Sequence, residues 1–149
     1  MHSKSEGEFQ AKLEYFEHEN HGSVPPIAFH NGISSIFEGY GITYRDVESI
    51  EQLKEHFQLI SNRLSYDFSP PEYLVNQLGY QMVQNNKAKA MDFFMLNTEN
   101  YPNSFNAFDS LGEFYEVTGE KEKAIENYTK SLELNPDNEN AKMKIEILN

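Results

Sequence analysis

The sequence predicts an all-α protein made of antiparallel helical hairpins, preceded by a short N-terminal extended segment and one further helix. Two observations lead to this prediction. Apolar residues recur at helical spacing along most of the chain, and a block near the C-terminus repeats with a step of 34 residues. A repeat of this length is typical of helical hairpins that bury their apolar faces only by stacking on their neighbours.

The composition limits the kinds of partner that we expect. The 149-residue chain has 24 acidic and 12 basic residues, a formal net charge of −12 and 38% hydrophobic residues. No cluster of Lys and Arg is present, so neither a nucleic acid nor an anionic membrane surface is an expected partner. A basic peptide or protein would complement this charge. The alternative is that the acidic surface only keeps the protein in solution.

The sequence carries no signal for a membrane span or for export. Its apolar runs fall short of the roughly 20 residues that a membrane helix needs, and its first residues lack the apolar core of a secretory signal. We therefore expect a soluble chain, whose compartment the sequence does not specify. Cysteine is absent, which excludes disulfides and thiolate metal sites.

The N-terminal 45 residues differ from the rest. Residues 12–17 alternate in polarity and predict a short strand, residues 21–26 read as a loop, and Ile27 to Tyr40 predicts a helix. That helix would carry Phe29, Ile33, Ile36, Phe37 and Tyr40. One strand and one helix do not make a domain, because a lone strand leaves its backbone groups unpaired. Pairing of residues 12–17 with a second copy would give a homo-oligomer.

A helix is predicted over Ile50 to Leu64. Its apolar residues lie three or four apart on one face, and Ser49 followed by Gln52 is a plausible capping box. Ser69-Pro70-Pro71 then interrupts the chain. We expect this helix to cover the open end of the hairpin array, since a terminal unit needs one polar face.

The repeat is clearest when residues 86–102, NKAKAMDFFMLNTENYP, are aligned with residues 120–136, EKEKAIENYTKSLELNP. Ala90 falls on Ala124, and Phe94 falls on Tyr128. Small residues, together with Gly79 and Gly112 upstream, would let paired helices approach closely. Pro102 and Pro136 would follow the second helix of each hairpin, and Gly119 suits the left-handed position after a helix.

Residues 105–138 resemble a tetratricopeptide repeat. The residues on the signature positions are Phe108, Leu111, Gly112, Tyr115, Ala124, Tyr128 and Pro136. Residues 72–104 look like a diverged first copy, and residues 140–149 like a capping helix. The resemblance implies that residues 46–149 form a helical domain with a right-handed superhelical stack, and that its role is to bind or pack against protein.

The resemblance also implies a groove, because the first helix of each hairpin lines the concave side of such arrays. Carried over to this chain, the lining residues are Tyr73, Asn76, Tyr80 and Val83 from the first copy, and Asn106, Asp109, Glu113 and Glu116 from the second. The family's clamps for acidic peptides use Lys and Arg at such positions, which this chain lacks. A basic segment is therefore the expected ligand. Alternatively, two repeats make too small a groove, and the face packs on a parent domain or on a second copy.

The segment EYFEHENHGSVP, residues 14–25, resembles the histidine loop of esterases in the alpha/beta-hydrolase family. The resemblance implies that residues 1–45 are the C-terminal remnant of a hydrolase and that His21 is the general base of a Ser-His-Asp set. An ordinary loop histidine is the alternative.

No G-x-S-x-G motif, which would supply the nucleophile, occurs in the chain. The chain alone is therefore not expected to be catalytic. Two hypotheses stay open: a protein-interaction or packing module of an esterase, or the part that delivers the catalytic histidine to a carboxylic-ester hydrolase. The histidines lack metal-ligand spacing, so we expect no metal and no cofactor.

Overall fold

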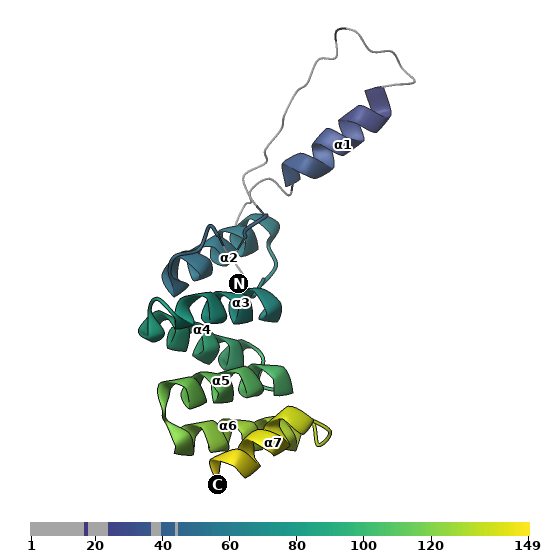
Figure 1. Cartoon of the computed structure of the whole chain (residues 1–149). Coiled ribbons are helices and arrows are strands. Elements are labelled where there is room, and N and C mark those ends of the chain that lie inside the picture. Colours follow the sequence, from purple (N-terminus) through teal and green to yellow (C-terminus); the bar gives the residue numbers. More distant parts are fainter. Residues whose placement is uncertain (1–16, 18–23, 37–39, 44) are drawn as a thin grey trace, which may run out of the picture. The chain divides into compact units, whose positions relative to one another are not determined.

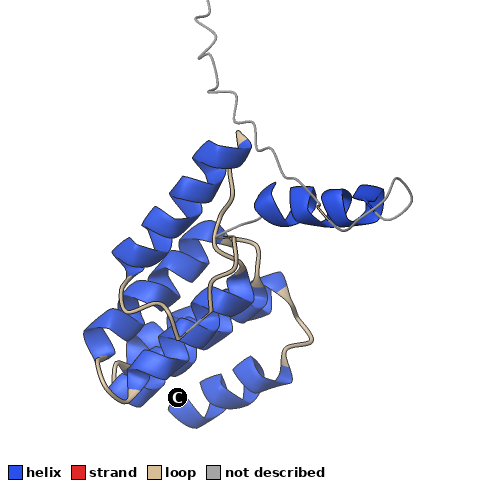
Figure 2. Cartoon of the chain, turned by 90° about the horizontal axis from the view of Figure 1, so that it is seen from above, coloured by secondary structure: helices blue, strands red, loops and turns tan. Residues whose placement is uncertain are grey.

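The computed structural model describes residue 17 and residues 24–36, 40–43 and 45–149. All regular secondary structure in these residues is helical, as Figures 1 and 2 show. The predicted all-α class is thus confirmed for the described part. The chain divides into two units, residues 1–41 and residues 42–149.

The first unit contributes one described helix, α1, which spans Val24–Ile36. The predicted bounds, Ile27 to Tyr40, were wrong: the helix begins three residues earlier, and Tyr40 lies in a turn. Pro25 and Pro26 fit the first helical turn, because the N–H groups there have no intrahelical acceptor. Of the predicted strand at residues 12–17, residues 12–16 lie outside the described residues and Glu17 is in a turn.

The second unit begins with α2, Ile50–Leu64, which has the predicted bounds. The Ser49 side chain accepts a hydrogen bond from the backbone N–H of Gln52, as a helix N-cap does. The buried side of α2 presents Leu53 and Phe57, which join a cluster with residues of the next two helices. The members of this cluster are Val47, Leu53, Phe57, Leu74, Val75, Leu78, Phe93 and Leu96.

Two hairpins and a last helix follow. The first hairpin pairs α3, Glu72–Val83, with α4, Lys87–Asn100. The second pairs α5, Phe105–Thr118, with α6, Lys121–Leu134, and α7 covers Glu139–Leu148. Each of α4 to α7 packs on the helix before it, so α3 to α7 form a stack that runs in chain order in Figure 1.

A glycine and an aromatic ring hold each hairpin together. A Cβ atom on Gly79 would lie 2.8 Å from the Phe94 ring, and one on Gly112 would lie 2.9 Å from the Tyr128 ring. Both rings are completely buried. Close approach therefore requires glycine at both positions. On α7 the corresponding residue, 34 positions after Gly112, is the exposed Glu146.

The main core is continuous across the hairpins. Phe94, Leu111, Ala124 and Tyr128 share one buried cluster, as the repeat pattern predicts. Removing a large apolar side chain from water contributes about 1.5–3 kcal/mol. A few such residues therefore supply much of the stability of a domain of this size.

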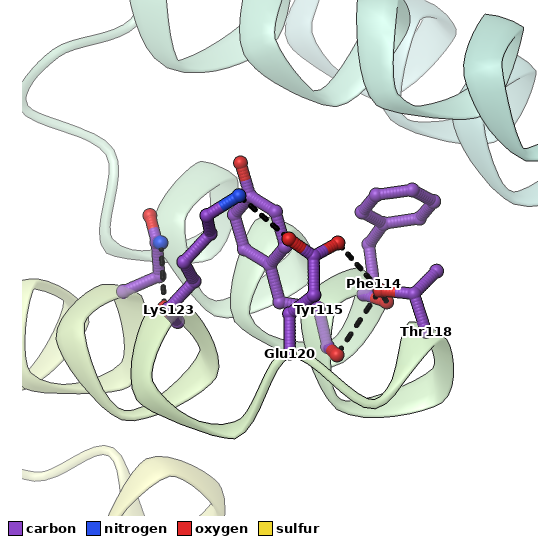
Figure 3. Close-up of polar contacts among 6 residues, drawn as sticks. Phe114, Tyr115, Thr118, Glu120 and Lys123 are labelled. Atoms are coloured by element: carbon purple, nitrogen blue, oxygen red, sulfur yellow. Dashed lines mark hydrogen bonds and ion pairs between the residues drawn. The ribbon is translucent and has the colours of Figure 1, made fainter.

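The turn between α5 and α6 is fixed by local contacts (Figure 3). Gly119 adopts a left-handed conformation with φ of 83°, which glycine tolerates best. The Thr118 hydroxyl donates to the Phe114 and Tyr115 carbonyl oxygens, 3.0 and 3.1 Å away. Lys123 pairs with Glu120 at 2.6 Å and lies 5.1 Å from the centre of the Tyr115 ring.

Candidate functional site

The first helices of the repeats, α3, α5 and α7, present one shared surface, which we call the first-helix face. It consists of Glu72, Tyr73, Asn76, Tyr80, Asn106, Asp109, Glu113, Glu116, Asn140, Met143, Lys144 and Ile147. Hydrogen bonds from one of these helices to the next join eight of these side chains: Glu72, Tyr80, Asn106, Asp109, Glu113, Glu116, Asn140 and Lys144. The other four are assigned to the face by their spacing of three or four residues along α3 and α7. The face thus depends on the stacking of the hairpins, and no single helix could form it.

Three of these links join α3 to α5 and to Ser104, the residue just before α5. The Tyr80 hydroxyl donates to Glu113 Oε2 over 2.6 Å. Near the other end of α3, Glu72 Oε1 accepts from Ser104 Oγ at 2.8 Å and from Asn106 Nδ2 at 2.9 Å. All of these donors are neutral, so the bonds leave the negative charges of Glu72 and Glu113 in place.

Three further links join α5 to α7 and to Asn138, the residue just before α7. Asp109 accepts from Asn138 Nδ2 at 2.8 Å and from Asn140 Nδ2 at 2.9 Å. Glu116 forms an ion pair with Lys144 at 2.8 Å. Of the four carboxylates on the face, Glu116 is the one with a cationic partner among residues 45–149.

The environment of Glu116 explains its ionisation. Burial raises the pKa of its carboxyl group, but the hydrogen bonds from Lys144 and Tyr128 outweigh burial and hold the pKa below its ordinary value of 4.5. The Tyr128 hydroxyl lies 2.8 Å from Glu116 Oε2. Glu116 is therefore ionised and held by two donors at neutral pH.

The two tyrosines that donate to these carboxylates remain protonated. Burial, and then the hydrogen bond to Glu113, raises the pKa of Tyr80 above its ordinary value of 10. Burial and the hydrogen bond to Glu116 raise the pKa of Tyr128 in the same way. Both hydroxyls therefore act as donors throughout the physiological pH range.

Apolar and aromatic side chains on α3 and α7 accompany the carboxylates of α5. Tyr73 on α3 is 73% exposed and Tyr80 is 41% exposed. On α7, Met143 and Ile147 are 50% and 69% exposed, and they stand 34 residues after Asp109 and Glu113. The face thus combines uncompensated carboxylates on α5 with exposed apolar groups on α3 and α7.

The predicted groove residues lie on α3 and α5: Tyr73, Asn76, Tyr80, Asn106, Asp109, Glu113 and Glu116. That they line a groove stays a prediction. Val83, by contrast, packs into the core with Phe94, so its assignment to the groove was wrong. Sequence reasoning missed Asn140, Met143, Lys144 and Ile147, because the last helix was treated only as a cap. Adding 34 to the predicted residues of α5 would have found Asn140, Met143 and Ile147.

His21 lies outside the described residues, so the prediction that it descends from a catalytic base stays a prediction. In the described part of the chain, no group of three or more His, Asp or Glu side chains is placed to hold a metal ion. Within that same part, no helix is both long and apolar enough to cross a membrane.

A separate hollow of about 450 Å³ lies along α6. It is lined by Phe108, Glu126, Asn127, Thr129, Lys130 and Glu133. Its polar groups are largely engaged locally, since Lys130 pairs with Glu133 at 2.8 Å and Asn127 donates to a carbonyl oxygen of its own helix. It therefore offers fewer free interactions than the first-helix face.

No family model matches this chain, and a search of curated proteins finds no match either.

Proposed function

We propose that residues 72–149 form a tetratricopeptide-like superhelical array that binds a basic segment of another protein through the first-helix face. The observation that carries this proposal is the chemistry of that face. Glu72, Asp109 and Glu113 are fixed by neutral donors and keep their charge, and exposed aromatic side chains stand beside them.

Glu113 is the expected anchor for a cationic side chain. The Tyr80 hydroxyl fixes the position of its carboxylate, so little conformational entropy is lost when a ligand binds. The Glu113 side chain is also partly buried, and a hydrogen bond between charged groups is stronger there than in open water. Glu116 is less suited to this role, because Lys144 already occupies it.

The tyrosines on α3 favour the same class of ligand. A lysine or arginine above an aromatic ring gains about 0.5–1 kcal/mol at an exposed site. An apolar ligand residue beside the cation would cover Tyr73 or Tyr80 on one side, or Met143 and Ile147 on the other. The expected ligand is thus a basic segment with apolar residues near its cation.

The arrangement of the helices supports the tetratricopeptide part of the proposal. Paired helices meet at Gly79 and Gly112, and first helices follow one another at intervals of 33 and 34 residues. The ligand belongs to a partner protein in this proposal. A parent hydrolase domain and a second copy of the chain are the competing occupants of the face.

Selection of displayed heptapeptides on the full chain tests the proposal. Selected peptides should be enriched in Lys or Arg, and Glu113→Gln should weaken their binding about tenfold, which corresponds to one lost charge-assisted hydrogen bond. Glu99→Gln on α4, outside the face, is the matched control and should bind like the wild type. Selection of acidic or uncharged peptides would contradict the proposal, as would a stable dimer that Glu113→Gln dissociates.

A further inference from the structure

Four buried polar atoms on α3 and α4 have no hydrogen-bond partner in the described part of the chain. They are Asn76 Oδ1 on α3, both amide atoms of Asn97 on α4, and Asn100 Nδ2 on α4. Asn97 is completely buried. An amide removed from water without a partner is costly, and buried polar atoms of native proteins nearly always have one.

The second hairpin shows what the corresponding atoms do when they are paired. Asn97 corresponds to Ser131 by the step of 34, and Asn76 corresponds to Asp109 by the step of 33. Asn138 Nδ2 bridges this second pair, donating to Asp109 Oδ1 and to Ser131 Oγ at 2.8 Å each. A single amide group therefore joins α5, α6 and the start of α7.

The first hairpin has no such bridge. The residue that corresponds to Asn138 is Ser104, whose shorter side chain donates to Glu72 Oε1 at 2.8 Å. Asn76 and Asn97 hold the sequence positions that correspond to the bridged pair, Asp109 and Ser131. The junction between α3, α4 and the start of α5 is thus built on the same plan without its connecting group.

The donors and acceptors among the unpaired atoms indicate which kind of molecule could take the place of the bridging amide. Two of them are acceptors and two are donors, and none carries a charge. Asn97 and Asn100 are three residues apart and share one face of α4. A metal ion would find no carboxylate among these atoms, whereas water both donates and accepts and commonly fills polar sites of this kind.

We propose that at least one ordered water molecule is bound at this junction, where it takes the place of the Asn138 amide. It donates to Asn76 or Asn97 and accepts from the Asn97 or Asn100 amide. This inference does not depend on what the first-helix face binds.

Water–protein nuclear Overhauser effects on the full chain give the direct test. The side-chain amide protons of Asn97 should show a contact to a long-lived water molecule. The Asn138 amide protons serve as the internal control and should show none, because their acceptors are side chains. A crystal structure in which Asn76 and Asn97 bond directly, without water, would overturn the proposal.

Two variants sharpen this test. Asn97→Leu, which is similar in size, should lower the melting temperature by about 5 °C, since it removes the partners of the water. The pair Asn97→Ser with Ser104→Asn introduces the counterparts of Ser131 and Asn138 and should stay within about 2 °C of the wild type. Because this variant lacks the Asn97 amide, loss of the water contact is measured at the Asn100 side-chain amide protons. If Asn97→Leu instead raised the melting temperature, the site would be dry and the proposal wrong. If the Asn97→Leu protein failed to fold, the wild-type measurement alone would test the proposal, and absence of a water contact at the Asn97 amide protons would contradict it.

Discussion

The two hairpins of this protein share their apolar packing and differ in their polar connections. In both, a buried ring lies against a helix glycine, Phe94 on Gly79 and Tyr128 on Gly112. The second hairpin adds hydrogen bonds that the first one lacks. The Tyr128 hydroxyl reaches Glu116, and Glu116 reaches Lys144 on the following helix.

The difference shows which interactions define a repeat and which connect it to its neighbour. Ring and glycine are the same in both copies because the distance between paired helices leaves no room for a side chain. The polar residues vary because each junction meets a different neighbour. Packing therefore sets the fold of each hairpin, while polar residues determine how firmly it joins the next.

The largest effect should come from filling the space at the glycine. Gly112→Leu should destabilise the array by about 3 kcal/mol or more, because its side chain would collide with the buried Tyr128 ring. Urea unfolding followed by circular dichroism measures this. Gly32→Leu on α1 is the control, since a Cβ there meets nothing within 4 Å. A Gly112→Leu protein as stable as the wild type would show that the shared packing is not what holds the hairpin.

A reciprocal exchange of the two rings should give intermediate effects. Phe94→Tyr should cost about 2 kcal/mol, because Val83 stands in the place of Glu116 and offers no side-chain acceptor to a buried hydroxyl. Tyr128→Phe should cost about 1 kcal/mol, through loss of the bond to Glu116. Both values come from denaturant titration. Equal stability of the two variants and the wild type would mean that the polar difference between the hairpins has no energetic consequence.

The smallest effect concerns the charge that links α5 to α7. The pKa of Glu116 is lower in the folded protein than its ordinary value of 4.5, so its contribution is present above that pH and is lost as the pH falls through the folded value. At pH 7, Glu116→Gln should cost about 1 kcal/mol or less. Thermal unfolding should show that the difference in melting temperature between wild type and variant becomes smaller below pH 4.5. A difference that widened on acidification would contradict this assignment.

Much of the hairpin geometry could be predicted from the sequence. The 34-residue step identified the paired helices, Gly79 and Gly112 were expected to allow their close approach, and Gly119 was expected in the left-handed position after a helix. That the Phe94 and Tyr128 rings lie against the two glycines emerged only from the structure. These features depend on side-chain size and on local backbone conformation. Both can be judged from a single residue, such as the absence of a side chain at Gly112 or the large ring of Tyr128, without knowledge of the neighbouring repeat.

The connections between repeats were harder to predict. Val83 occupies the position of Glu116 in the other copy, yet the valine packs on Phe94 while the carboxylate reaches outward to Lys144. A periodic pattern assigns both residues to one helix face. The apolar valine is nevertheless buried in the core, whereas the charged glutamate forms an ion pair. The start of α1 was missed for another reason, because Pro25 and Pro26 were taken as loop residues.

The attachment of α7 has a consequence for how the array opens. Ala141 is the one residue of this helix that is fully buried, and hydrogen bonds from Asn140 and Lys144 join the helix to α5. Its amide protons should therefore exchange with solvent through local detachment, well before those of α3 to α6. Each detachment would also separate Asp109 from Asn140 and Glu116 from Lys144. Because Lys144 is the cationic partner of Glu116, a transient loss of this helix would make the neighbouring surface more strongly anionic.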